Sequence, residues 1–174
     1  MSEEDNLDIL DQTTLGESAR EVELRGREEL AWAALRLTQQ AQRTVEIFTH
    51  DLDAPLYDRL EFLDALRQFA LRGKFSRVRI LLQELETPQR NDHRLILLYR
   101  RLPSRFELRL CHPDHADHAE NFLLADRLGY LHRRFFNEYA GTTDFAGKRQ
   151  AELLGRFFDE AWDKSEADYI LRGL

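Results

Sequence analysis

The sequence predicts a single α/β domain with a mixed, mostly parallel sheet that helices cover on both faces. Short β-branched segments alternate with segments whose apolar residues recur every three or four positions, a pattern typical of parallel strands joined by helical crossovers. The last three predicted strands follow one another without a helix, so part of the sheet should be antiparallel. A length of 174 residues suits one domain.

The first half of the chain predicts two helix–strand units. Apolar residues at helical spacing indicate a helix over residues 20–41, and the alternating segment 44–49 indicates a strand. A second helix over residues 60–72 should stop at Gly73, because glycine often caps the carboxyl end of a helix. Residues 77–82 are then predicted as the second strand.

The second half predicts one more crossover helix and an antiparallel end to the sheet. Thr87 and Pro88 suit the cap and the first position of a helix, which should run to Pro103. The remaining predicted elements are strands over 106–110, 121–125 and 130–133, a tight turn at 126–129, and a long last helix around 151–162 after a loop of about ten residues.

Negative charge is concentrated at the amino terminus. The net charge is −7, and residues 1–30 hold ten acidic and three basic side chains, so the rest of the chain is neutral. We expect residues 1–19 to be an acidic flexible tail and residues 20–174 to be the single domain. Residues 90–109 hold six arginines and are a candidate basic face. The overall acidity argues against duplex nucleic acid as a partner, because that binding depends on neutralising several phosphates.

Composition also excludes several classes of protein. The single cysteine, Cys111, excludes an internal disulfide and favours a reducing compartment, so the expected location is the cytoplasm. No apolar run approaches the roughly 18 residues of a membrane span. The sequence has no phosphate-binding loop, dinucleotide glycine pattern or Gly-x-Ser-x-Gly elbow, and no cofactor is predicted.

A site is expected where the carboxyl ends of the parallel strands meet, because ligands of open α/β sheets bind in the crevice outside those ends. The ends are residues 50–51, 83–84 and 111–112. His50 and Asp51 could act there as an acid–base pair, or could form a capped polar loop.

Two stretches resemble phospholipase D superfamily sequences. Residues 62–73 form a helix pattern that ends in Arg-Gly and leads into Val-Arg-Ile-Leu-Leu at 78–82, and the hairpin pattern at 121–131 continues the resemblance. The closing helix with Phe157, Phe158 and Trp162 also fits, so the resemblance spans about residues 28–165. It implies one half of the phospholipase D fold, of a bacterial type, and a homodimer.

The resemblance also implies that the family's catalytic motif is degenerate. Matching Asp126 to the family aspartate places Ala119 at the catalytic histidine and Asn121 at the lysine, and Arg133 and Arg134 fall where Gly-Ser belongs. The family transfers a phosphodiester through a phosphohistidine, which needs an imidazole nucleophile and a cation for the phosphate oxygens. Alanine and asparagine supply neither, so the usual hydrolysis should be lost.

The leading hypothesis is therefore a non-catalytic phospholipase D-like domain that acts as a binding or regulatory module. Its ligand would be a small anion or a protein partner. The candidate ligand-binding residues are Asn121, Arg133, Arg134, His50 and His112.

The alternative is a hydrolase with an altered phosphodiesterase-type site, with or without a metal. A one-residue bulge could bring His118 to the nucleophile position, with Glu120 in place of the lysine and Asp126 retained. The possible metal ligands are Cys111, His112, His115 and His118. The same run also suits a solvated polar loop, so no metal is predicted. The sequence leaves open whether the domain is a dead enzyme or a repurposed one.

Overall fold

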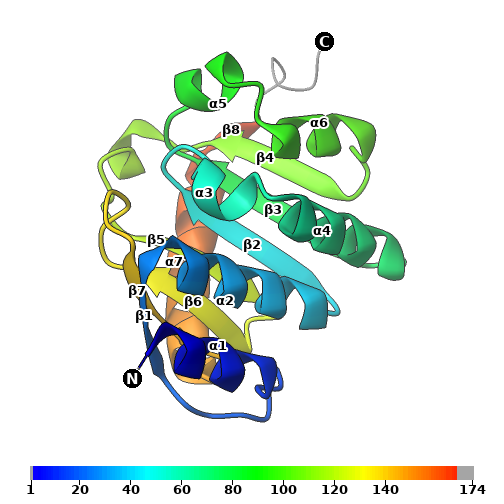
Figure 1. The fold of residues 1–174 in the computed structure, drawn as a ribbon. Helices are drawn as coiled ribbons and strands as arrows, with labels where there is room; N and C mark the ends of the chain where they lie inside the picture. Colours follow the sequence, from blue (N-terminus) through cyan, green and yellow to red (C-terminus); the bar gives the residue numbers. More distant parts are fainter. Residues whose placement is uncertain (1, 168–174) are drawn as a thin grey trace.

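The structure is a computed structural model that describes residues 2–167. Its strands are β1 (Val22–Arg25), β2 (Thr44–Thr49), β3 (Arg77–Leu82), β4 (Phe106–Leu110), β5 (Asn121–Ala125), β6 (Gly129–Arg133), β7 (Ala140–Asp144) and β8 (Glu166–Ala167). They form one eight-stranded sheet in the order β1-β7-β6-β5-β2-β3-β4-β8 (Figure 1). An α/β fold is confirmed.

The sheet is mostly antiparallel, so the expected parallel majority is wrong. Only β2 with β3 and β3 with β4 pair in parallel among the described strands. The other five pairings are antiparallel. The reason is that β5, β6 and β7 follow one another through short turns, and short turns can join only antiparallel neighbours.

Helices cover both faces of the sheet, as expected. They are α1 (Glu3–Asp11), α2 (Gly26–Gln40), α3 (Ala54–Tyr57), α4 (Leu60–Arg72), α5 (Glu86–Arg90), α6 (Arg94–Arg101) and α7 (Lys148–Lys164), with a 3-10 turn at Pro113–His115. In Figure 1, α2 and α4 lie in front of the sheet and α7 crosses behind it. None of the helices in residues 2–167 is long and apolar enough to cross a bilayer.

Side-chain alternation along the strands builds a core on each face. In β2, Val45 and Ile47 join the larger cluster under α2 and α4, whereas Phe48 joins the cluster under α7. On that second face Phe158 and Trp162 of α7 pack against the sheet. Successive residues of a strand point to opposite faces, so one short strand serves both clusters.

Part of the segment predicted to be a flexible tail forms a helix that packs on the domain, α1 at Glu3–Asp11. Ser2 caps α1 and exchanges hydrogen bonds with Asp5 in a capping box. Leu10 is fully buried in the larger core cluster. Asn6 donates to the Glu23 carbonyl and to the Glu29 carboxylate, at 3.1 and 3.0 Å. A buried leucine and a bonded asparagine one turn apart fix this helix on the domain despite its charge.

Two strands lie where the sequence indicated other structure. Residues 22–25 form β1 rather than the start of a helix over 20–41, and α2 begins at Gly26, whose φ of 87° lies in the left-handed region. Glycine adopts this conformation without steric cost, so the chain can turn sharply from strand to helix. Strand β7 occupies the expected loop before α7.

Candidate functional site

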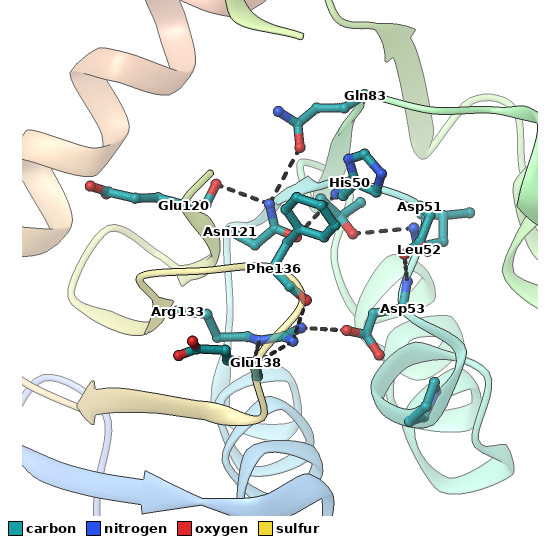
Figure 2. A network of polar contacts seen from close by, with 12 residues as sticks. His50, Asp51, Leu52, Asp53, Gln83, Glu120, Asn121, Arg133, Phe136 and Glu138 are labelled. Atoms are coloured by element: carbon teal, nitrogen blue, oxygen red, sulfur yellow. Dashed lines mark hydrogen bonds and ion pairs between the residues drawn. The ribbon is translucent and has the colours of Figure 1, made fainter. Parts of the chain in front are cut away.

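Polar side chains meet where the carboxyl ends of β2 and β3 face the start of β5. We call His50, Asp53, Gln83, Asn121 and Arg133 the strand-end network. Asn121 bonds to His50 and Gln83, and Arg133 pairs separately with Asp53; Figure 2 shows the residues from close by. The position of the network agrees with the sequence-based expectation that a site lies at this edge of the sheet.

Asn121 lies at the position that the resemblance assigns to the catalytic lysine. Its side chain bonds to the ends of neighbouring strands. Its side-chain oxygen accepts from the His50 backbone N–H at 3.0 Å. Its amide nitrogen donates to the Glu120 carbonyl at 2.9 Å and to Gln83 Oε1 at 3.5 Å. The residue is 4% exposed. Its polar atoms are therefore engaged within the protein, and none is left to hold a ligand.

Gln83, which the sequence placed at one of the three strand ends but did not name as a ligand-binding candidate, organises the loop before β5. Its side-chain nitrogen donates to the carbonyls of His115, Ala116 and His118, at 3.1, 3.2 and 2.7 Å. One amide thus holds the loop that carries three of the candidate histidines. A polar residue directly after a buried strand was the available signal for it.

Arg133 forms a buried ion pair that has a structural role. Its side chain is 2% exposed and is paired with Asp53. It also donates to the carbonyls of Phe136 and Glu138, at 2.7 and 2.8 Å (Figure 2). This guanidinium neutralises Asp53 and pins the loop after β6, so it is not available to an anion.

Arg134 lies away from the network. It is exposed and lines a separate groove of about 530 Å³ together with His132 and Thr142. Arg134 forms no ion pair or hydrogen bond with another described residue, in contrast to its neighbour. The two arginines that the sequence grouped as one anion site are therefore in different surroundings.

The two remaining ligand candidates also lie apart. His50 stacks on Phe136, with ring centroids 3.9 Å apart. His112 is 41% exposed, and its Nδ1 accepts from the Asp114 backbone N–H at 3.1 Å, which caps the 3-10 turn. His112 thus has the capping role that the polar-loop interpretation implies.

The alternative catalytic residues do not form one constellation. His118 stacks on Phe157 with centroids 4.3 Å apart, and burial lowers the pKa of its imidazole. Glu120 pairs with His132 at 2.8 Å. Asp126 lies at the far end of β5, in the turn to β6, and accepts hydrogen bonds from backbone N–H groups. A shared proton-transfer site among the three is absent.

The alternative metal site is not formed. Within residues 2–167 no group of three or more histidine, cysteine, aspartate or glutamate side chains could hold a metal ion. His112 and His118 have the separate partners described above. Cys111 is half-buried, and burial raises the pKa of its thiol to about 11, which disfavours the thiolate that a metal requires. The alternative ligand set of Cys111, His112, His115 and His118 is therefore wrong for this structure.

An acidic pocket of about 370 Å³ lies beside the strand-end network, and the sequence did not reveal it. Asp51, Asp53 and Asp58 line it, with Phe136 and Tyr139 among its other residues. The three aspartates follow β2 within eight positions of each other. Their clustering just after a predicted strand was the signal that could have found the pocket.

His93, which also lines this pocket, is a buried neutral histidine. Its Nε2 lies 2.9 Å from the Leu52 carbonyl, which can only accept, and its Nδ1 accepts from the Leu95 N–H at 3.2 Å. Both bonds together require the neutral ring. Burial lowers the pKa of His93 below the ordinary 6.5, although the charge of Asp58 opposes this.

Stability is therefore expected to fall in mild acid. Below about pH 6.5 the unfolded chain binds a proton at His93 that the folded protein excludes, so the free energy of unfolding drops as the pH falls toward the folded-state pKa. His118, whose pKa is also lowered, acts in the same direction. Urea unfolding of H93N at about pH 7.5 and about pH 5.5 checks this. Asparagine can cap α6 without titrating, so the drop should be smaller than in the wild type. An equal drop in both proteins would contradict the role of His93.

Comparison with known proteins gives a family and a fold. A family model described as "Domain of unknown function (DUF7931)" matches residues 26–174. No curated protein matches the sequence. Among solved structures, the archaeal chromatin protein TrmBL2, which was reported to show a novel mode of DNA binding, has a TM-score of 0.63 at 19% identity. That match covers 95% of this chain and 60% of TrmBL2, so this chain spans less than two thirds of that protein.

Two further structures resemble the chain. Nuc from Salmonella typhimurium, a phospholipase D family member, has a TM-score of 0.60 at 13% identity, over 78% of this chain and 88% of Nuc. NucT from Helicobacter pylori has a TM-score of 0.65 at 11% identity, over 86% of this chain and 99% of NucT. These similarities confirm the phospholipase D fold, and at such low identity they show the fold alone.

Proposed function

The chain belongs to the family described as "Domain of unknown function (DUF7931)", and from that premise we propose that it is a phospholipase D-fold domain without phosphodiesterase activity that serves as a binding or regulatory module. The observation that carries this proposal is the internal use of Asn121 and Arg133. The resemblance to phospholipase D sequences places both residues at positions of that family's catalytic motif. Both are buried and bonded within the chain.

Phosphoryl transfer needs a nucleophile and free positive charge. The imidazole of the strand-end network, that of His50, stacks on Phe136, and the network holds no unpaired cation. Ala119 has no reactive group. The chain has three lysines, Lys74, Lys148 and Lys164, and none of them belongs to the network. The remaining cation of the network, Arg133, is neutralised by Asp53. A phosphate placed at this edge would therefore meet no compensating charge.

The ligand of such a module is better sought among protein partners than among anions. Negative groups surround the network, because Asp51 and Asp58 line the adjoining pocket. Anionic ligands would be repelled there, whereas a basic surface of another protein would be attracted. Arg134 is the one ligand candidate from the sequence that remains exposed and without a described partner.

DNA is a weaker candidate, although TrmBL2 was reported to bind it. The arginine-rich stretch 90–109 does not form a free basic face. Arg94 binds Asp58, Arg105 donates to the carbonyls of Gly73 and Lys74, and Arg109 binds Glu107 and the Trp162 carbonyl. Since these guanidinium groups already have partners, few remain to displace counterions from a duplex. A homodimer and a cytoplasmic location remain predictions.

A chromogenic phosphodiester such as bis(4-nitrophenyl) phosphate tests the absence of hydrolysis. We expect the purified protein to release no nitrophenol above the buffer rate, with or without added Zn²⁺ or Mg²⁺. A phospholipase D enzyme assayed in parallel is the positive control. Turnover that H118N or E120Q abolishes would overturn the proposal and establish the altered hydrolase instead. H112N, which changes an exposed capping histidine, is the matched control for those variants.

A further inference from the structure

We propose that the pocket of about 370 Å³ beside the strand-end network binds a cationic side chain, arginine or lysine, of a protein partner. This inference rests on the proposed binding function and names the chemistry of its ligand. Hereafter we call this cavity the Asp51 pocket. A volume at the small end of the range for ligand pockets suits one side-chain head group.

The charges of the Asp51 pocket leave one carboxylate uncompensated. Asp58 is paired with Arg94 at 2.6 Å, and Asp53 is paired with Arg133. Asp51 has no cationic partner within the described chain, and its Oδ1 accepts the Asp53 backbone N–H at 3.0 Å. Two paired aspartates and one aspartate without an ion pair make the lining of the pocket acidic.

A second observation points independently to a missing hydrogen-bond donor. Asp53 lines the pocket and is 8% exposed. One of its oxygens meets Arg133, and the other, Oδ1, is buried without a hydrogen-bond partner among residues 2–167. Figure 2 shows this carboxylate with one oxygen turned to Arg133 and the other turned away. A buried acceptor without a donor is costly, so Asp53 brings an unsatisfied carboxylate oxygen to the wall of the pocket.

The wall of the Asp51 pocket also suits a cation. Phe136 and Tyr139 line it, and aromatic faces attract guanidinium and ammonium groups. Tyr139 already does so within the chain, since the guanidinium carbons of Arg27 and Arg133 lie 4.6 and 5.2 Å from its ring centroid. Carboxylates beside aromatic rings form a surface for a charged head group with an apolar stem.

The test is a binding titration of the isotope-labelled full chain, followed by the NMR signals of its backbone amides. The probes are N-acetyl-arginine amide, N-acetyl-lysine amide and N-acetyl-citrulline amide, of which citrulline has the shape of arginine without its charge. We expect arginine or lysine to shift the signals of Asp51, Asp53 and Asn137 in a saturable way that weakens with salt. Citrulline should not do so.

The variant D51N should weaken binding of the cationic probe by up to about fivefold, which is what the loss of one partly exposed ion pair implies. Asparagine can still accept the Asp53 N–H, so the turn is retained. D8N makes the same charge change at an exposed residue on α1 and should bind like the wild type. Equal binding of citrulline, or equal affinity of D51N and the wild type, would overturn the proposal.

Failure of this inference is distinguishable from failure of the proposed function. If no probe binds while the diester assay shows no turnover, the cationic ligand is wrong and the non-catalytic module stands. If the diester is hydrolysed, the module proposal fails whatever the probes do. A preference for arginine over lysine would assign the planar, multiply donating head group as the ligand.

Discussion

Replacement of Arg133 by methionine should lower the free energy of unfolding by about 3–5 kcal/mol, the usual cost of removing one partner of a buried ion pair. The substitution leaves Asp53 as a buried charge without its counterion. It also frees the carbonyls of Phe136 and Glu138, which accept from the guanidinium. Urea unfolding measures the effect as a lower midpoint with an unchanged slope.

The neighbouring arginine is the matched control. R134M changes an exposed side chain, so its effect should stay within about 0.5 kcal/mol. Adding D53N to R133M should recover part of the loss, because the buried carboxylate charge is then removed as well. If R133M and R134M lower the free energy of unfolding by the same amount, Arg133 does not form the structural ion pair described above.

Replacement of Asp126 by alanine should lower the free energy of unfolding by about 2–4 kcal/mol. Hydrogen bonds to a charged group contribute about 1.5–3 kcal/mol each, and water replaces part of them at a half-buried site. The carboxylate accepts the backbone N–H groups of Gln42, Arg43 and Thr44, at 2.8, 2.7 and 3.0 Å. Asp126 also has a φ of 54°, a conformation that aspartate tolerates better than alanine.

The variant D126N separates the effect of the lost hydrogen bonds from the effect of the backbone conformation at residue 126. Asparagine tolerates the same backbone conformation and keeps one acceptor oxygen, so D126N should lose clearly less stability than D126A. Thermal or urea unfolding of the two variants beside the wild type decides it. An unchanged free energy of unfolding in D126A would mean that the three backbone hydrogen bonds do not contribute to stability. The expected loss would show that Asp126, which the resemblance matches to the family aspartate, stabilises the start of β2.

Much of the fold could be predicted because its central strands are short, apolar and bounded by polar turns. The predicted spans 44–49, 77–82, 106–110 and 121–125 coincide with β2 to β5. Strands β1 and β7 could not be found in this way. Val22 and Leu24 are only two apolar positions beside a helical pattern, and β7 has the sequence Ala-Gly-Thr-Thr-Asp. Pairing with distant strands, rather than local propensity, makes these segments extended.

The sequence could indicate that polar side chains gather at the strand ends, but the hydrogen-bonded state of these residues could not be predicted. The sequence indicates that Arg133 and Asn121 lie near strand ends. It does not indicate that Asp53, 80 positions away, neutralises that arginine. Nor does it indicate that the Asn121 amide is satisfied by His50 and Gln83. Whether a polar side chain is free or bonded depends on contacts between distant segments, which local patterns do not contain.

The place of β1 at the edge of the sheet has a consequence for how this domain is delimited. The family model begins at residue 26, yet β1 (Val22–Arg25) pairs with β7 and Leu10 of α1 fills the core. A fragment cut at residue 26 would leave the backbone groups of β7 open along one side and uncover apolar surface beneath α1. Because β1 is itself an edge strand, the larger change would be the apolar surface that α1 no longer covers, and we expect a fragment of residues 26–174 to associate more readily than the full chain.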